Sequence, residues 1–578
     1  MPYRNLAEQH GTARPEHSTI LEDQGDESHS QARLRSSPRE PHLPETPTTV
    51  VAASANLTLT VDDDHNPKAE KKDPTVVEAQ TDYSNTVAKE DYSVFTTWQK
   101  RWIIIAASFA SWFSPMTGSI YFPALSKIAE DLHVSDAKVS ITVTTYLIIQ
   151  GLAPMMIAGF SDKAGRRPAY FICFAIYIVA NLALGLQDSY VALLVLRMLQ
   201  SAGSSGTVAL ANGVVGDLVT SAERGKYVAW ASLGVILGPS LSPVIGGLLS
   251  QYLDYHWIFW FLLILSVVFY IPFFLFMPET CRKIVGDGSV PPPWSSWNLS
   301  DQIRHRKRSR QNIAVDNEKA SELRKNYRIS IPNPISSLRI LTDLEAALLL
   351  LSTGLGLACY YAIITGASVA FTSVYGFNQL QVGLVFLSIG GGSILSAFTT
   401  GKLIDWNYKR HARRLNFPVT KNRLTDLSAF PIERARLEIG LPCQLLGGAC
   451  VIGYGFMMSH HVSIAGPVIM LFLFGYLFIA GSQTINVLMV DIYPTRAAAA
   501  TAANNVVRCL LGAASSAAIV PMTEAMGNGL AYLTLVLLFF VGCLGQVACV
   551  RYGMKWREKL KEKAARRERR RADNGSRS

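Results

Sequence analysis

Long uncharged stretches alternate with short polar ones through most of this chain. The segments "IIIAASFASWFSPMTGSIYF" (103–122) and "GLAYLTLVLLFFVGCLGQVACV" (529–550) contain no charged residue. A helix needs about 20 apolar residues to cross a bilayer, and large soluble proteins seldom contain uncharged runs of that length. The pattern therefore predicts an all-α membrane protein with twelve transmembrane helices, which begin near residues 102, 138, 168, 190, 227, 257, 346, 381, 440, 465, 497 and 529.

The polar segments indicate how the chain is organised. Residues 1–97 contain 9 Lys/Arg and 17 Asp/Glu and are rich in Ser, Thr and Pro. Such a composition cannot bury enough apolar surface to fold alone, so we expect a disordered tail. The other expected parts are an N-terminal six-helix bundle (98–280), a central loop (281–342), a C-terminal six-helix bundle (343–552) and a basic tail (553–578).

The net charge of +11 reflects basic residues in loops rather than a nucleic-acid-binding surface. Loops 161–168 and 402–439 hold three and nine Lys/Arg, and the central loop and residues 551–578 hold twelve each. The loops on the opposite side of the membrane hold none, apart from Lys127 and Lys138 after the first span. Because basic loops stay in the cytoplasm, we expect both termini and the central loop there, in a multi-pass protein of the plasma membrane.

Two further features narrow the class of protein. The eight cysteines lie in or just beside the predicted spans, so no disulfide framework is implied. The first 100 residues show no cleavable signal, so the span from 102 is expected to direct insertion.

The polar stretch "GFSDKAGRRP" (159–168) follows the second span. Its glycines permit close helix approach and a tight reversal, and its aspartate is expected to face the N-terminus of a neighbouring helix. Its arginines are expected to reach an aspartate at the end of the fourth span. The alternative is an ordinary basic loop. The residues expected to control the conformation are Gly159, Asp162, Gly165, Arg166, Arg167 and Asp217.

A similar stretch, "GKLIDWNYKR" (401–410), follows the eighth span, six spans later. Both stretches leave a span with Gly, then Asp, then two adjacent basic residues. Duplicated six-helix halves are typical of transporters whose substrate site lies between the halves.

These motifs resemble those of the major facilitator superfamily. "RMLQSAGSSG" (197–206) is similar to its fourth-span motif, with Ser201 in a glycine position. "GVILGPSLSPVIGGLL" (234–249) resembles the fifth-span motif of antiporters, with Ser242 in a glycine position, and "MPET" (277–280) closes the sixth span as in drug:proton antiporters. Segments near 281–293, 401–410 and 501–513 are similar to the fungal quinidine-resistance-type subgroup, which includes organic-acid exporters.

The resemblance covers about 98–552. It implies two pseudo-symmetric six-helix bundles around a central cavity that work by alternating access. It also implies export driven by inward proton flow, with no cofactor besides the proton gradient. The fifth-span residues to which it assigns conformational gating are Gly238, Pro239, Pro243, Gly246 and Gly247.

The charges inside the spans indicate a candidate substrate site. No Asp or Glu lies within the twelve spans as read from the sequence, and only Arg197 and Arg508 are basic residues well inside one. Such charges are costly in a membrane and functional by default, and two guanidiniums without an acid favour an anion. The expected substrate and proton site is Arg197, Gln200, Ser201, Ser204, Gln483, Asn486, Asn504, Asn505 and Arg508. Alternatively, the amides only join helix to helix.

Aromatic side chains could line the same cavity, and the candidates are Tyr121, Trp230, Tyr360, Tyr361 and Tyr454. The preferred hypothesis is a proton-coupled exporter of an anionic or weakly acidic metabolite, not an enzyme, that acts as a monomer in the lipid bilayer and binds neither metal nor nucleic acid. No nucleotide-binding loop of the type G-x-x-x-x-G-K-[ST] is present, which argues against direct ATP coupling. Broad drug efflux is the first alternative, and a non-transporting receptor or scaffold is the second.

Overall fold

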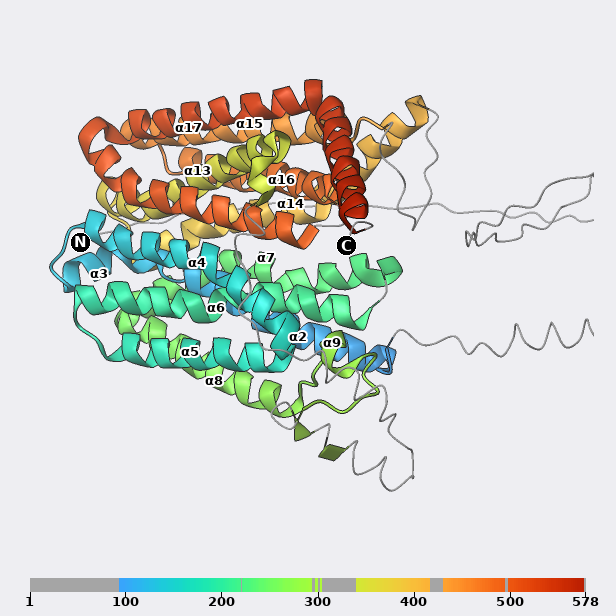
Figure 1. Cartoon of the computed structure of the whole chain (residues 1–578). Helices are drawn as coiled ribbons and strands as arrows, with labels where there is room; N and C mark the ends of the chain where they lie inside the picture. The colour runs from blue at the N-terminus through green and yellow to red at the C-terminus, as the bar shows by residue number, and fades with distance from the viewer. Residues whose placement is uncertain are drawn as a thin grey trace, which may run out of the picture. The chain divides into compact units, whose positions relative to one another are not determined.

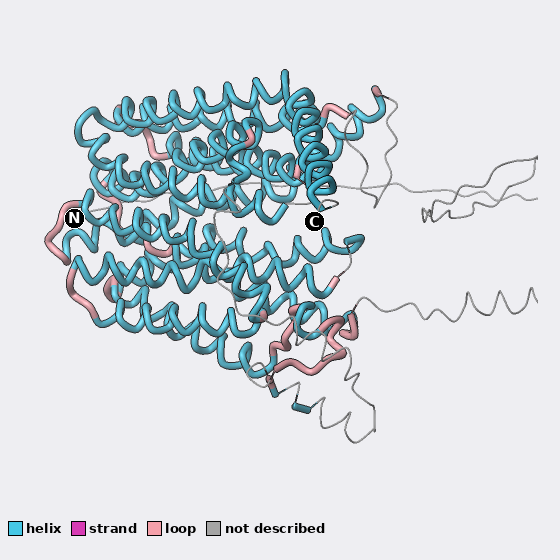
Figure 2. The backbone as a smooth tube through the Cα atoms, in the orientation of Figure 1, coloured by secondary structure: helices cyan, strands magenta, loops and turns pink. Residues whose placement is uncertain are grey.

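The computed structural model describes residues 93–219, 221–293, 297–299, 302–303, 339–415, 430–493 and 497–575. The described residues form helices and connecting loops, with no strand among them (Figures 1 and 2). This confirms the prediction of an all-α protein. The expected disordered tail lies outside the described residues up to Tyr92, as does most of the expected central loop.

Six long helices make up the N-terminal bundle. They are α2 (Thr97–Ser119), α4 (Asp136–Ala164), α5 (Arg166–Leu186), α6 (Tyr190–Leu218), α7 (Ser221–Tyr252) and α8 (His256–Phe276). The short η1 (Phe122–Ala124) and α3 (Leu125–Asp131) extend α2, and the short α9 (Arg282–Val285) follows α8.

The C-terminal bundle begins with the short η3 (Arg339–Thr342). Its long helices are α13 (Leu344–Tyr375), α14 (Gln379–Arg414), α15 (Ile432–Ser459), α16 (Ala465–Ile492) and α17 (Ala497–Gly575). Helix α17 is interrupted at Gly527, whose φ of 79° suits a residue without Cβ, and the chain reverses direction there (Figure 1).

Ten described helices are long and apolar enough to cross a membrane. That number includes α17 once and omits α6, a 29-residue helix that carries Arg197. When α17 is divided at Gly527 and α6 is added, the helices agree with the twelve predicted spans. The helices are longer than the predicted spans; α15, for example, begins at Ile432 rather than near 440.

The helix ends define two faces of the molecule. We call the face that holds Ala164, Leu218, Phe276 and Leu344 the tail face, and the face that holds Leu186, Tyr252, Tyr375 and Gly527 the loop face. Several helices begin at side chains that cap backbone N–H groups: Thr96 and Gln99 form a capping box at α2, and Ser135 accepts from the backbone of Lys138 at α4.

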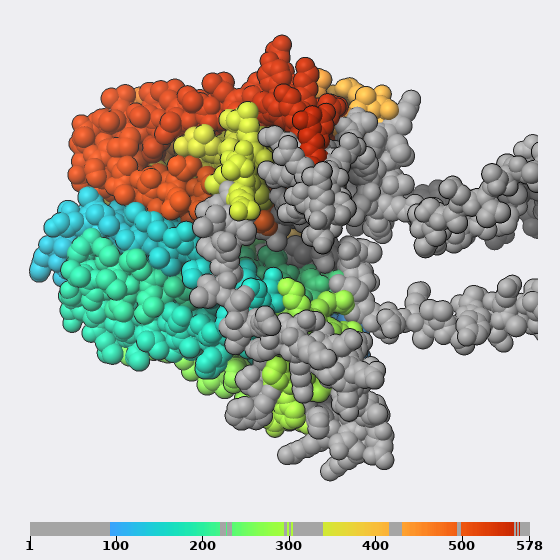
Figure 3. Space-filling view, in the orientation of Figure 1, coloured from blue at the N-terminus to red at the C-terminus, as the bar shows by residue number. Residues whose placement is uncertain are grey.

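The two bundles pack against each other through α4 with α17 and through α7 with α14. Asn505 Nδ2 donates to the Gln150 carbonyl at 3.1 Å, and Thr144 Oγ1 donates to the Ala513 carbonyl at 3.2 Å. Thr144 lies toward the loop face of α4 and Gln150 and Ala513 lie near the middle of their helices, whereas Asn505 lies toward the tail face of α17. In the space-filling view the two bundles adjoin as a blue-green mass and a yellow-red mass (Figure 3).

Candidate functional site

Arg197 lies inside the N-terminal bundle and is only 1% exposed. Its guanidinium carbon is 4.1 Å from the centroid of the Tyr121 ring and 4.4 Å from that of the Tyr146 ring. Its Nη1 donates to Gln200 Oε1 at 2.5 Å, while its Nε is buried without a hydrogen-bond partner. Two aromatic faces therefore compensate part of the cost of burying this charge.

The other predicted polar residues of α6 complete a buried network. Gln200 Nε2 donates to Asn181 Oδ1 of α5 at 2.7 Å. Ser201 Oγ donates to the Tyr146 carbonyl at 2.7 Å, and Ser204 Oγ lies 3.4 Å from the hydroxyl of the same tyrosine. All four predicted residues of α6 are buried, so the network joins α4, α5 and α6 within the bundle.

Arg508 is in a different situation. It lies in α17 before Gly527, is partly exposed, and its Nε is buried without a hydrogen-bond partner. It is close enough to act electrostatically on Tyr360 and Tyr361 of α13. No hydrogen bond or ion pair of Arg508 is found within the part of the chain that the structure describes.

The amides near Arg508 are mostly bonded to other helices. Asn504 Nδ2 donates to Asn486 Oδ1 of α16 at 2.6 Å, and Asn505 bonds to α4 as described above. Gln483 is exposed on α16. These amides therefore serve, at least in part, to join helices.

The structure does not direct the two arginines toward each other. Cα–Cβ bonds in a helix tilt toward its N-terminus. Helix α6 begins at the loop face and α17 begins at the tail face, so the side chains of Arg197 and Arg508 lean in opposite directions. Tyr146 lies against Arg197, and Tyr361 is close enough to interact electrostatically with both Tyr146 and Arg508.

The aromatic candidates differ in exposure, as the two arginines do. Tyr121 and Tyr454 are fully buried, at 0% and 1% exposure, whereas Tyr360 and Tyr361 are partly exposed beside Arg508. Trp230 is 40% exposed on α7.

The polar loop after α4 forms a charged network at the tail face. Arg166 donates through Nη1 to Asp162 and through Nε to Asp217, both at 2.8 Å. The predicted proximity of Arg166 and Asp217 is thus present in the structure. Asp162 accepts from Arg166 rather than capping a helix, and its side chain is 52% exposed.

The carboxylate that does cap a helix is Glu279, which follows α8. Its Oε1 accepts from the backbone N–H of Arg166 at 2.9 Å, and its Oε2 accepts from that of Arg167 at 3.0 Å. Burial raises the pKa of Glu279, whereas backbone hydrogen bonds from Cys281, Arg166 and Arg167 act in the opposite direction. A Cβ on Gly165, whose φ is 109°, would lie 2.5 Å from Glu279 Oε2.

Arg167 fixes the start of the central loop to the N-terminal bundle. Its Nη1 donates to the Trp297 carbonyl at 2.6 Å, and its Nη2 donates to the Phe274 carbonyl at 2.8 Å. The expected boundary at 281 therefore falls inside a segment that packs on this bundle. Gly159 is partly buried near the end of α4.

The Gly and Pro residues of α7 lie where other helices approach closely. A Cβ on Gly238 would lie 2.9 Å from Pro115 of α2, and a Cβ on Gly246 would clash with the Ile120 carbonyl. A Cβ on Gly247 would lie 2.5 Å from the Gln379 carbonyl of α14. Pro239 and Pro243 lie within α7, and a Cβ on Gly383 of α14 would lie 2.6 Å from the Pro243 carbonyl. The segment therefore contacts both its own bundle and the other one.

A family model described as Major Facilitator Superfamily matches residues 107–517. The chain belongs to this superfamily. The match spans both bundles and agrees with the resemblance seen in the motifs.

The relatives of this superfamily member are transporters. It is 52% identical to the MFS-type transporter phiD of a fungal species over 82% of this chain and 71% of that protein. It is 50% identical to the MFS-type transporter tstD of Talaromyces stipitatus over 82% of this chain and 86% of that protein. Citrate exporter 1 of Aspergillus niger is 32% identical over 87% of this chain and 95% of that protein. The protein is therefore a multi-pass membrane transporter rather than an enzyme.

A solved structure of human MFSD10, titled an organic anion transporter, has the same fold. It aligns with a TM-score of 0.50 at 16% sequence identity and covers 77% of this chain and 99% of that chain. At this identity the likeness concerns the fold of the superfamily member alone.

Several residues of the two networks were missed from the sequence. Asn181 and Tyr146 lie in uncharged spans. The only sequence feature that could have indicated them is a single polar group within an apolar run. The helices also extend beyond the predicted spans and bring in acids at the tail face. Glu345 and Glu433, each the second residue of its helix, are buried, and Glu433 pairs with Arg557 at 2.7 Å. The sequence predicted that no Asp or Glu lies at mid-depth of a span, and the described helices have none there.

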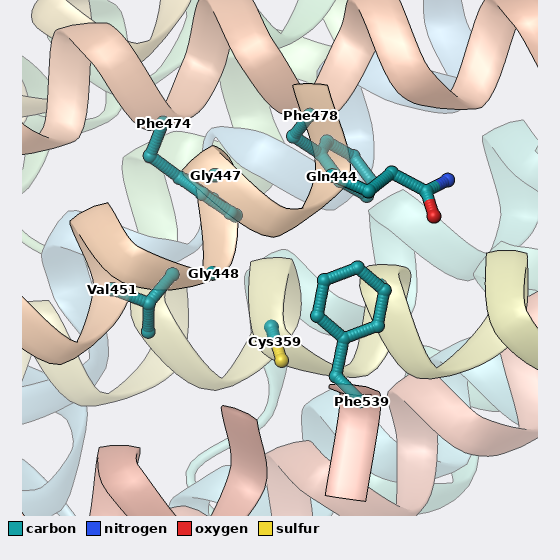
Figure 4. Close-up of a pocket in the computed structure, with 9 residues that line it drawn as sticks. Cys359, Gln444, Gly447, Gly448, Val451, Phe474, Phe478 and Phe539 are labelled. Atoms are coloured by element: carbon teal, nitrogen blue, oxygen red, sulfur yellow. The ribbon is translucent and has the colours of Figure 1, made fainter. Parts of the chain in front are cut away.

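The C-terminal bundle also encloses a small cavity between α13, α15, α16 and α17 (Figure 4). Its lining includes Cys359, Gln444, Phe478 and Phe539. Its volume of about 10 Å³ is near the minimum that holds one water molecule, so it is too small for a metabolite.

Proposed function

We propose that this transporter exports a small organic anion or weakly acidic metabolite from the cytoplasm and that inward proton flow drives the export. The observation that supports an anionic substrate is Arg508, a cation at mid-depth of a helix without a partner among the described residues. An unpaired charge in a membrane is costly, and an anionic ligand would compensate it. The citrate exporter among the relatives transports, by its name, an organic acid.

In this proposal Arg508 contacts the substrate, while Arg197, Gln200, Ser201 and Ser204 hold the helices of the N-terminal bundle in place. Proton coupling and export are what the antiporter-like motif of α7 implies. In the same proposal the protein acts as a monomer in the plasma membrane. Both termini lie in the cytoplasm in this proposal, because the basic loops lie at the tail face.

The contact of Thr144 with Ala513 and the close approach of Gly247 to Gln379 lie at mid-helix or toward the loop face, which fits a conformation that is open to the tail face. In alternating access, these contacts would separate when the site opens to the other side. Gly247, Gly383 and the prolines of α7 would form the surface along which the bundles rock.

The test is flux in proteoliposomes of the purified full chain, with and without an imposed pH gradient. Candidate substrates come from an untargeted metabolite comparison of medium from deletion and overexpressing cells. We expect a pH gradient to accelerate movement of an anion. Gradient-dependent flux of neutral or cationic compounds only would favour broad drug efflux, and no flux of any compound would favour a receptor or scaffold.

A further inference from the structure

The two mid-span arginines differ in how far a ligand can reach them. Arg197 is 1% exposed between two tyrosine rings. Arg508 is partly exposed and has no hydrogen bond or ion pair among the described residues. A ligand between the bundles therefore meets one available guanidinium rather than two.

The side chains next to Arg508 are aromatic. Tyr360 and Tyr361, consecutive in α13, are both partly exposed, and their rings meet edge to face at 5.7 Å. Tyr360 stacks on Phe478 of α16 with a centroid distance of 5.2 Å. Tyr361 lies 6.4 Å from Phe122 of the other bundle. Tyr360, Tyr361 and Phe478 thus form an aromatic wall beside Arg508, and this wall reaches the interface of the bundles.

Close packing holds this wall against Arg508. A Cβ on Gly512, one turn after Arg508, would lie 2.7 Å from Tyr361 Cδ2. The glycine therefore lets α17 approach the tyrosine ring.

The neighbouring amides are neutral and partly occupied. Asn504 Nδ2 donates one of its two N–H groups to Asn486, and Asn505 Nδ2 donates one to the Gln150 carbonyl. A second or third carboxylate would therefore enter this site without a second available cation among the described residues. Burying an uncompensated charge is strongly unfavourable.

We infer that the substrate carries a single anionic group on a planar, largely apolar body. This inference rests on the proposed function, since it takes Arg508 as the residue that contacts substrate. The anionic group pairs with Arg508, and the planar body packs on Tyr360 and Tyr361, whose ring faces favour flat apolar partners. A compact polyanion such as citrate does not match this site.

The test uses the full chain in nanodiscs and equilibrium binding of tritiated 2-naphthoate. The competitors are 2-naphthamide, a neutral compound of the same shape, and citrate, a polyanion without an apolar body. We expect 2-naphthoate to bind about tenfold more tightly than either competitor.

Variants identify the residues involved. Arg508→Gln should weaken 2-naphthoate binding about tenfold and leave 2-naphthamide binding unchanged, and Arg508→Lys should restore part of the loss. Arg551→Gln, which removes an exposed arginine from the part of α17 that follows Gly527, is the matched control and should bind as the unmodified protein does. Tyr361→Leu should weaken 2-naphthoate more than cyclohexanecarboxylate, whose ring is not planar. Gel filtration and thermal melting verify that each variant is folded.

The outcomes separate this inference from the function on which it rests. Citrate binding as tightly as 2-naphthoate, with loss in Arg508→Gln, would overturn the single-anion inference and leave anion transport intact. Equal binding of 2-naphthoate and 2-naphthamide that is unaffected by Arg508→Gln would overturn both.

Discussion

Each bundle carries one arginine at mid-depth of a described helix, and the surroundings of the two arginines differ. In the N-terminal bundle, Arg197 is enclosed by Tyr121, Tyr146 and Gln200. In the C-terminal bundle, Arg508 is partly exposed and has no such hydrogen bond among the described residues. The same residue type is thus enclosed in one half and partly exposed in the other. What distinguishes them is the set of neighbouring helices, not depth or charge.

The strongest way to break this comparison is Arg508→Ala. We expect flux of the natural substrate to fall about a hundredfold, because the variant removes the charge that compensates the anion. The melting temperature should stay unchanged, since no described hydrogen bond or ion pair is lost. Flux in proteoliposomes and thermal melting of the same sample measure the two effects. A large drop in melting temperature would show that Arg508 is structural as well.

The reverse result is expected for Arg197→Gln. The substitution removes two cation–π contacts and a buried hydrogen bond, so the free energy of unfolding should fall by about 2 kcal/mol or more. Any loss of flux should follow the loss of folded protein. Thermal melting measures the stability, and flux per folded molecule is the control. If folded Arg197→Gln binds the anion more weakly than the unmodified protein does, Arg197 also contacts substrate.

Asp162→Asn extends the comparison of the two arginines to an acidic residue that is paired, with Arg166, but exposed. Arg166 keeps its bond to Asp217 in this variant, so the protein should fold and insert. Transport should slow about tenfold, because the stability of one conformation changes. The measurement is the flux rate at equal surface expression. Asp217→Asn, which breaks the more buried bond of Arg166, is the matched variant and should have the larger effect. Unchanged flux in both variants would reduce the segment to an ordinary basic loop.

The smallest effect is expected outside both bundles. Deleting residues 1–90 should change flux by less than about twofold, because those residues lack the apolar periodicity needed to pack on either bundle. The cut precedes Val94, whose backbone N–H donates to the Asp287 carbonyl at 3.0 Å and is kept. Uptake and surface labelling together measure the result. A truncated protein that reaches the surface without transporting would assign a function to the tail.

Much of the fold could be predicted because its causes are local. An uncharged run of about 20 residues is stable in lipid only as a helix, since each backbone group must then be bonded within the segment. The starts of α6, α16 and α17 coincide with the predicted starts for this reason. The ends at the tail face were less predictable, because helices such as α15 continue past the membrane-length run and bury Glu433.

The candidate site could be predicted only in part. A census of charges identified Arg197 and Arg508, and the motif after α4 indicated the proximity of Arg166 and Asp217. The census could not assign partners, because Tyr121 and Tyr146 lie 76 and 51 residues away from Arg197 in sequence. Glu279 was recognised as part of a motif, but its role as the cap of α5 depends on how α8 ends beside Gly165.

The sequence by itself thus determined the class of protein, its all-α architecture of membrane-length helices and the superfamily. Composition and short motifs are sufficient for these, since transfer into lipid and helix formation depend on neighbouring residues. Only the tertiary structure decided which arginine is enclosed and which is available. That outcome depends on the side chains that distant helices bring to within about 4 Å, where cation–π contacts and hydrogen bonds act.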